Sequence, residues 1–146
     1  MTFPYAAKCK ILLVEDSLSL IRMLEQLLTT EGYNVQRAHS HEEAIERLAE
    51  ERFHVAVIDA RLDDNDPYNH DGLSLMRELR VIDPSTGILM LTIAADLEIV
   101  REAIYSVAGE IHPVFELSST PAYDYVQKLP HELRWISNKV QRVLED

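Results

Sequence analysis

Apolar residues follow two patterns that alternate along the chain. Short continuous apolar runs are typical of strands buried on both faces of a parallel sheet, and helical spacing of apolar residues is typical of the segments that cover such a sheet. The predicted strands are Lys10–Val14, Tyr33–Ala38, Val55–Asp59, Gly87–Thr92 and Tyr123–Lys128. Strands and helices that alternate in this way predict an α/β fold, with a parallel sheet covered on both faces and right-handed connections.

Local signals place the predicted helices between these strands. Ser17 and the Ser40–Glu43 capping box are typical of helix starts, Gly32 of a helix end, and Pro130 of a first helical turn. Another helix is expected to start at Asp96 and to end near Gly109. The inward-facing residues expected in three of the helices are Leu18, Ile21, Leu24, Leu27 and Leu28, then Leu75, Met76, Leu79 and Ile82, and finally Leu133, Ile136, Val140, Val143 and Leu144.

Length and charge limit the classes of function. The 146 residues fit a single domain, 1–146, and the single cysteine, Cys9, excludes an internal disulfide and suits a reducing compartment. With no long apolar run or cleavable leader, the expected location is cytoplasmic, without a membrane. A net charge of −11 opposes binding to nucleic acid or to an anionic bilayer and favours cations as ligands.

Charged and hydroxyl side chains lie at or just past the ends of four of the predicted strands. In a parallel sheet the carboxyl ends of the strands lie at one edge, where ligands and chemistry collect. Three neighbouring carboxylates repel one another by roughly 4 kcal/mol per close pair at an effective dielectric near 20, so they require a cation, and their hard oxygen atoms suit Mg²⁺. The residues brought to this edge are Glu15, Asp16, Asp59, Thr92 and Lys128.

Asp59 is the expected nucleophile of this group. An aspartate beside Mg²⁺ can attack a phosphorus atom to give an aspartyl phosphate, because the metal and a lysine neutralise the charge on the phosphoryl oxygens. Glu15 and Asp16 are the expected metal ligands, Thr92 the hydrogen-bond donor to a phosphoryl oxygen, and Lys128 the fixed positive charge.

These residues carry a family resemblance. The segments Ile11–Asp16, Val57–Asp59, Met90–Thr92 and Ala122–Lys128 together resemble the receiver domain of two-component response regulators, over essentially the whole chain. The resemblance implies a flavodoxin-like, doubly wound five-stranded parallel sheet of order 2-1-3-4-5. It also implies the site: Asp59 as phosphoacceptor, Glu15, Asp16 and the backbone carbonyl of Arg61 as further Mg²⁺ ligands, Thr92 and Lys128 as phosphate contacts, and Tyr125 as the aromatic switch coupled to Thr92.

The function implied is that of a phosphoacceptor in a phosphorelay. Mg²⁺-dependent transfer from a histidine kinase or a phosphotransfer protein to Asp59 would switch a partner-binding surface, with at most self-phosphorylation and self-dephosphorylation as enzymatic activity. The alternative is a phosphorylation-independent, receiver-like interaction module. A true phosphohydrolase is disfavoured, because Asp59-Ala60-Arg61 lacks a second carboxylate to act as acid or base.

The chain departs from the family pattern at three places. The polar loop Leu62–Gly72 is enlarged, and about fourteen extra residues precede Ala122, for which the sequence predicts no definite structure over 109–122. In the family a proline directly follows the lysine, whereas here Leu129 stands between Lys128 and Pro130. A competing register takes Val114–Leu117 as the fifth strand and leaves the site without its lysine.

Trp135 lies off the apolar stripe of the last predicted helix. An exposed tryptophan there is suited to anchor an output protein or a second copy through the last helix and the insertion. A ring half-buried against the insertion is the other interpretation.

Overall fold

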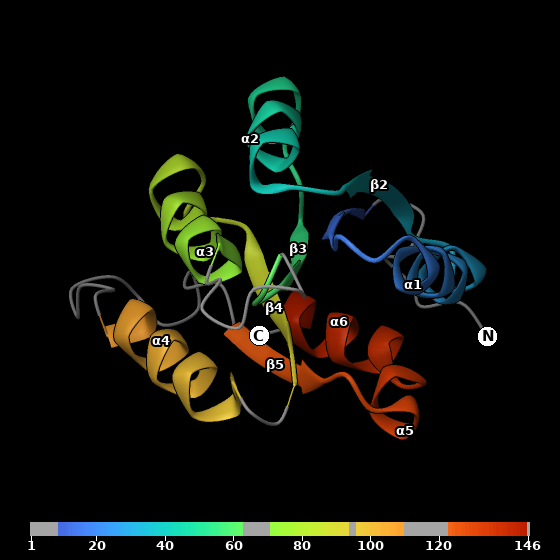
Figure 1. Cartoon of the computed structure of the whole chain (residues 1–146). Coiled ribbons are helices and arrows are strands. Elements are labelled where there is room, and N and C mark those ends of the chain that lie inside the picture. Colours follow the sequence, from blue (N-terminus) through green and yellow to red (C-terminus); the bar gives the residue numbers. More distant parts are fainter. Residues whose placement is uncertain (1–8, 63–70, 94–95, 110–122, 146) are drawn as a thin grey trace.

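The computed structural model describes residues 9–62, 71–93, 96–109 and 123–145. Five strands form one sheet in which every neighbouring pair is parallel, in the order β2-β1-β3-β4-β5 (Figure 1). This arrangement confirms the predicted flavodoxin-like topology. The strands are β1 Lys10–Val14, β2 Asn34–Ala38, β3 Val55–Asp59, β4 Gly87–Thr92 and β5 Tyr123–Gln127, and the helices are α1 Leu18–Thr30, α2 His41–Glu50, α3 Asp71–Ile82, α4 Leu97–Gly109, α5 Pro130–Leu133 and α6 Ile136–Glu145.

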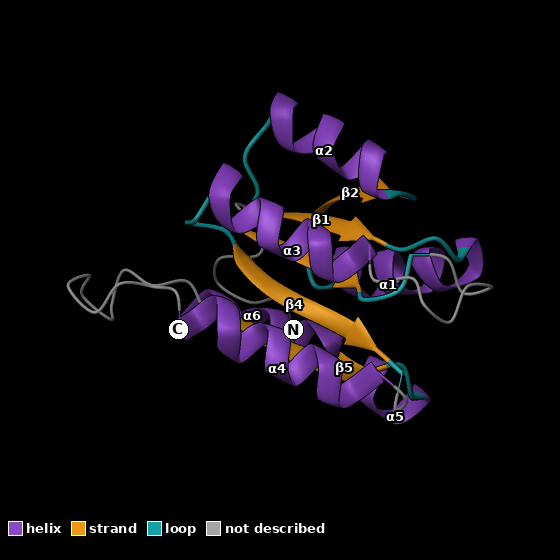
Figure 2. Cartoon of the chain, turned by 60° about the vertical axis from the view of Figure 1, so that its left-hand side comes forward, coloured by secondary structure: helices purple, strands orange, loops and turns teal. Residues whose placement is uncertain are grey.

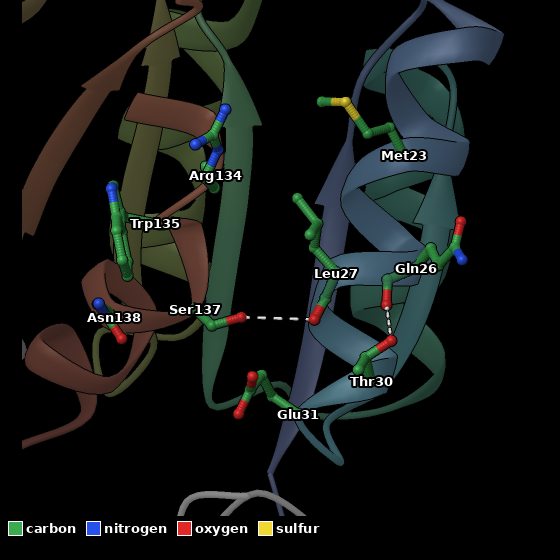
Figure 3. A pocket seen from close by; sticks show the side chains of 9 residues that line it. All are labelled: Met23, Gln26, Leu27, Thr30, Glu31, Arg134, Trp135, Ser137 and Asn138. Atoms are coloured by element: carbon green, nitrogen blue, oxygen red, sulfur yellow. Dashed lines mark hydrogen bonds between the residues drawn. The ribbon is translucent and has the colours of Figure 1, made fainter. Parts of the chain in front are cut away.

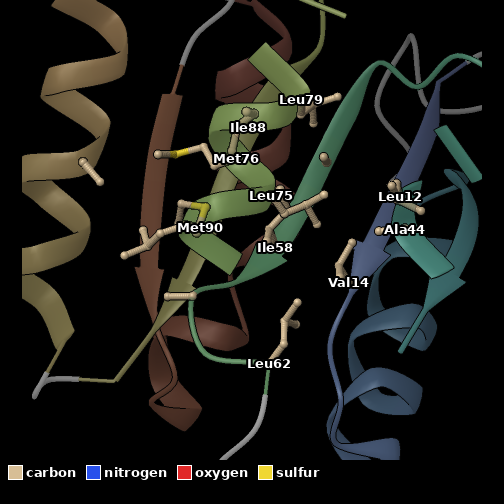
Figure 4. Close-up of a cluster of buried hydrophobic side chains, with 14 of the residues drawn as sticks. Leu12, Val14, Ala44, Ile58, Leu62, Leu75, Met76, Leu79, Ile88 and Met90 are labelled. Carbon is tan, nitrogen blue, oxygen red and sulfur yellow. The ribbon is translucent and has the colours of Figure 1, made fainter. Parts of the chain in front are cut away.

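The central strands are buried on both faces, as their continuous apolar sequences predict. Along β3, Val55 and Val57 join the cluster packed by α1, α5 and α6, whereas Ala56 and Ile58 join the cluster packed by α2, α3 and α4. Figure 2 shows the helices distributed over the two sides of the sheet, and Figure 4 shows part of the second cluster. Alternate side chains of β3 therefore pack against the helices on opposite faces of the sheet.

The helix boundaries follow the predicted local signals. The Ser17 hydroxyl accepts a hydrogen bond from Leu20 N, and the Ser40 hydroxyl accepts one from Glu43 N at 3.1 Å. Gly32, which follows the C-cap residue Glu31 of α1, adopts a φ of 97°, a conformation that glycine permits and other residues rarely adopt. The expected capping serines and the glycine stop are confirmed.

The fifth strand, Tyr123–Gln127, confirms the predicted strand Tyr123–Lys128 and ends one residue earlier. Tyr125 pairs with Met90, and Gln127 pairs with Thr92, on the edge of the sheet next to β4. The competing strand Val114–Leu117 and the enlarged loop at 63–70 lie outside the described residues.

Two of the residues expected to face inward do not. Leu18 is 48% exposed and Ile82 is 49% exposed. Leu18 is the first residue of α1 and Ile82 is the last residue of α3. Helical spacing predicted that the buried face reaches these helix ends, whereas in the structure it stops before them.

The last helix was predicted as one segment, and this is wrong. It breaks between Leu133 and Ile136, where Trp135 N donates to Glu132 O at 3.0 Å in a tighter turn than that of an α-helix. Trp135 projects from this break and is 60% exposed, consistent with its predicted place off the apolar stripe. Ser137 then approaches the carbonyl of Leu27 and ties α6 to α1 beside a groove of about 430 Å³ (Figure 3).

None of the described helices combines the length and apolar character needed to cross a membrane.

Candidate functional site

The carboxyl ends of β1, β3, β4 and β5 hold the predicted site residues. Backbone hydrogen bonds extend the sheet beyond the strand ends: Glu15 N donates to Ala38 O at 3.1 Å, and Lys128 N donates to Thr92 O at 2.7 Å. The backbones of Glu15 and Lys128 are therefore held by the neighbouring strands, although both residues lie just past the strand ends.

Lys128 lies between two buried carboxylates. Its Nζ is 2.7 Å from Asp59 Oδ2 and 3.3 Å from Glu15 Oε2. The side chain of Lys128 is 11% exposed, and those of Glu15 and Asp59 are 0% and 1% exposed. One ammonium group thus faces two carboxyl groups in a place where water screens their charges little. Lys128 reaches the site although Leu129, and not a proline, follows it in the sequence.

The two buried acids have displaced pKa values. Burial raises the pKa of Glu15 to about 9, and the neighbouring charge of Asp59 acts in the same direction, against the opposing effect of Lys128. Burial likewise raises the pKa of Asp59, and Lys128 opposes this shift most strongly. The site therefore favours a proton or a further cation when both acids would otherwise carry charge.

The predicted metal ligands meet at one point. Glu15, Asp16 and Asp59 each offer a carboxylate oxygen, and these atoms lie within 4.8 Å of one another. Among the described residues, the buried Oδ1 of Asp16 has no hydrogen-bond partner. Hard oxygen donors with an unsatisfied buried atom fit Mg²⁺. The structure gives Arg61 another link to the site, because its backbone N–H donates to Asp59 Oδ1 at 3.2 Å, while the role of its carbonyl stays a prediction.

Gly72 lets α3 approach the end of β3. A Cβ at this position would lie 1.8 Å from the carbonyl oxygen of Asp59. The residue belongs to the first turn of α3, so this close contact fixes the start of the helix against the strand that carries the carboxylate. The sequence placed Gly72 at the end of an enlarged loop and gave no sign of the contact.

Thr92 and Tyr125 lie on the neighbouring strands β4 and β5. Thr92 is 1% exposed, and its hydroxyl donates to the carbonyl of Ile93 at 3.0 Å. Tyr125 is half-buried and packs against the apolar cluster beneath α2, α3 and α4. Both residues lie on the strands that the sequence predicted for them, and their switching roles stay predictions.

An ion pair that the sequence did not predict links two segments beside the site. Arg61 Nη2 lies 2.9 Å from Asp96 Oδ1, with side chains 14% and 9% exposed. Arg61 follows β3 and Asp96 directly precedes α4. The sequence predicted Asp96 only as a helix start, and no local signal connects residues 35 positions apart.

The comparison with protein families decides the classification. The model described as the response regulator receiver domain matches residues 11–112. The chain belongs to this family. The receiver is a signalling domain of two-component systems, as its sequence motifs predicted.

Relatives and solved structures agree with this assignment. The chain is 31% identical over 94 residues to the transcriptional regulatory protein ZraR of Escherichia coli K12, and this match covers 64% of this chain and 20% of ZraR. It is 33% identical over 82 residues to the transcriptional regulatory protein GlrR of the same strain, a match that covers 56% of this chain and 17% of GlrR. The chain thus spans about a fifth of the length of these relatives. It superposes on the chemotaxis response regulator CheY4 of Vibrio cholerae with a TM-score of 0.69 and 27% identity, over 93% of this chain and 98% of that one. The receiver domain of NtrX from Brucella abortus has the same fold, with a TM-score of 0.69 and 20% identity, over 92% of this chain and 98% of that one.

Proposed function

We propose that the receiver accepts a phosphoryl group on Asp59 from a histidine kinase or a phosphotransfer protein, and that this modification switches a partner-binding surface. The observation that supports this most strongly is the placement of Lys128, with its ammonium group 2.7 Å from Asp59 Oδ2. A buried carboxylate beside a fixed cation is suited to attack an anionic phosphoryl group, because the cation offsets the charge that the two reactants share.

In the transfer step, an Asp59 carboxylate oxygen forms the new oxygen–phosphorus bond. The nitrogen–phosphorus bond of the phosphohistidine donor breaks, and its electron pair leaves with the imidazole nitrogen, which takes up a proton. Lys128 neutralises charge on the phosphoryl oxygens in this step. Hydrolysis by water restores the Asp59 carboxylate and releases inorganic phosphate.

Mg²⁺ is part of this proposal. The carboxylates of Glu15, Asp16 and Asp59, together with the backbone carbonyl of Arg61, would hold the ion, which supplies positive charge to the phosphoryl oxygens when bound. The chain itself supplies the oxygen ligands and the buried surroundings that keep them in place.

Thr92 and Tyr125 would carry the signal. In the structure the Thr92 hydroxyl is bonded to Ile93 O, so it must rotate away from that carbonyl to donate to a phosphoryl oxygen. Movement of Thr92 leaves space toward which the half-buried ring of Tyr125 turns. A few kcal/mol of differential binding are sufficient to shift such an equilibrium.

The partner-binding part of the proposal includes the face formed by α1 and α6. The groove there is lined by Met23 and Leu27 on one side and by the exposed Trp135 on the other (Figure 3). An output protein or a second copy of the chain would bind through this surface. The buried thiol of Cys9 suits the cytoplasmic location that the proposal includes.

Intact mass spectrometry tests the phosphoacceptor. The wild-type chain, incubated with Mg²⁺ and acetyl phosphate, is expected to gain about 80 Da, the mass of one phosphoryl group, and Asp59→Asn is expected to gain nothing. An unmodified wild-type chain under these conditions would support the phosphorylation-independent interaction module instead.

A further inference from the structure

A second groove lies between α2 and α3. It has a volume of about 730 Å³. The two helices stand next to each other over the same side of the sheet (Figures 1 and 2). Neither Trp135 nor any residue of the phosphoacceptor site lines this groove.

Three apolar residues line the groove, and two of them are exposed. Val81 is 83% exposed, the most exposed of the large apolar side chains in the described part of the chain, and its neighbour Ile82 is 49% exposed. Ile45 of α2 faces them from the other wall, and its inner side packs on the apolar core. Apolar surface of this kind on two adjacent helices is typical of a binding surface.

The rim of the groove is acidic. Glu42 and Glu46 of α2 and Glu78 of α3 line it. Glu78 contacts His41 at the start of α2. Within the described residues, no ion pair involves Glu42 or Glu46, whereas Glu43 of the same helix pairs with Arg47. The α2 side of the groove therefore carries two glutamates without an ion-pair partner, and the α3 side adds Glu78, whose described partner is His41.

Both walls repeat one spacing. In α2, Ile45 and Glu46 lie three and four positions after Glu42. In α3, Val81 and Ile82 lie three and four positions after Glu78. Residues at this spacing share one face of a helix. Each helix thus presents an acidic residue and apolar residues together to the groove.

We propose that this groove binds a basic amphipathic helix of a partner protein. Such a helix would place apolar residues on Ile45, Val81 and Ile82 and its lysines or arginines against Glu42, Glu46 and Glu78. A groove between two helices accepts a helix laid into it, whereas addition of a strand requires a free sheet edge, and the edges here are β2 and β5.

The charge of the rim selects this occupant over three others. A nucleic acid and an anionic membrane surface carry the same sign as the three glutamates. A second copy would bring its own acidic rim, on a chain whose net charge is −11. A cationic helix gains attraction where each of these is repelled.

The test uses the full, unphosphorylated chain, so its outcome is independent of the phosphoacceptor proposal. The probe is a synthetic helical peptide of about 14 residues, with leucines at positions three and four apart and lysines beside them. One control peptide has the same composition with the leucines scrambled, and another has glutamate in place of lysine. Binding is followed by amide chemical shifts of the labelled chain.

The leucine–lysine peptide is expected to shift signals of His41–Glu46 and Glu78–Ile82, and both control peptides are expected to leave them in place. Val81→Ser is expected to weaken binding by about tenfold, whereas Ile99→Ser, at a 43% exposed residue of α4, should change it by less than about twofold. Glu46→Lys is expected to weaken binding, and the matched change Glu102→Lys on the exposed side of α4 is not. All four substitutions are at surface residues that the core does not need.

Several results would overturn the proposal. Equal binding of the scrambled peptide would show attraction by charge alone, and an unchanged affinity of Val81→Ser would place the peptide elsewhere. Binding to vesicles of phosphatidylcholine and phosphatidylglycerol through the same residues would contradict the charge argument. Dimerisation of the free chain that Val81→Ser abolishes would assign the groove to a second copy.

Discussion

Arg61 and Asp96 form an ion pair that is nearly closed to solvent, with Nη2 and Oδ1 2.9 Å apart. It joins the segment after β3 to the start of α4, next to the strand end that carries Asp59. Any movement of α4 away from β3 has to break or stretch this pair. The ion pair is therefore a structural restraint between the site and the neighbouring helix.

Removing one partner of this pair leaves the other charge poorly solvated. Asp96→Ala is expected to lower the free energy of unfolding by about 2 kcal/mol, less than for a fully buried pair because Arg61 retains some contact with water. Urea denaturation measures the loss. Glu98→Ala, which removes the exposed pair with Arg101, is the matched control and should cost less than about 0.5 kcal/mol. Equal losses in the two variants would contradict a special role for the Arg61–Asp96 pair.

Lys128 is expected to affect metal binding and phosphorylation in opposite directions. Lys128→Ala removes a positive charge that competes with Mg²⁺ for Glu15 and Asp59, so Mg²⁺ affinity by calorimetry should rise by about tenfold. The rate of phosphorylation by acetyl phosphate should fall by about 10²- to 10³-fold, because the developing charge loses its fixed cation. Lys139→Ala, at a lysine paired with Asp124 away from the site, should change neither quantity. Unaltered phosphorylation of Lys128→Ala would show that another residue supplies the charge.

Gly72 is expected to tolerate no side chain. In Gly72→Ala the new Cβ would overlap the carbonyl oxygen of Asp59, so α3 or the end of β3 must shift. The expected cost is about 3 kcal/mol of unfolding free energy, with slower phosphorylation. Ser74→Ala, on the exposed side of the same helix, should be neutral or slightly stabilising. A Gly72→Ala chain as stable as wild type would mean that the helix start adjusts freely.

The stability of the metal-free chain should fall as the pH rises from about 5 to 9. The folded state keeps a proton on Glu15 up to a pKa of about 9, while the unfolded chain loses it near 4.5, so the folded state binds more protons across this interval. The slope for one such proton is at most about 1.4 kcal/mol per pH unit. Urea denaturation in the presence of a chelator at several pH values measures it.

One substitution and one change of conditions test whether Glu15 causes this decline in stability. Glu15→Gln removes the titrating group and should flatten the decline, and Mg²⁺ should reduce it because the metal stabilises the charged carboxylates. A metal-free wild-type chain whose stability is constant or increases over this interval, relative to Glu15→Gln, would show that Glu15 is not held protonated.

Much of the site followed from sequence because it depends on strand ends. The continuous apolar runs indicate where β1, β3 and β4 end, and a parallel sheet brings those ends to one edge. Glu15, Asp59 and Thr92 were therefore expected at the same edge. The register of β5 was harder to predict, because the extra residues before this strand include a second apolar segment, Val114–Leu117. In the structure, Tyr123–Gln127 forms the strand.

Features that depend on tertiary geometry were not predictable in the same way. The Arg61–Asp96 pair requires the positions of two loops, and the close approach of Gly72 requires the angle of α3 against β3. Helical periodicity also continued through the break at Trp135, because Leu133, Ile136 and Val140 keep an apolar stripe on both sides of it. Periodicity reports which face is buried, and it is insensitive to a tight turn within the segment.

The most direct test of the central claim is to locate the phosphoryl group. The chain treated with Mg²⁺ and acetyl phosphate is reduced with borohydride, which converts an aspartyl phosphate to homoserine, and tandem mass spectrometry then identifies the altered residue. The account predicts homoserine at position 59, and none there when the phosphodonor is omitted. Homoserine at Asp16 or Asp96 instead, or no conversion at any aspartate, would contradict the assignment of Asp59 as the phosphoacceptor.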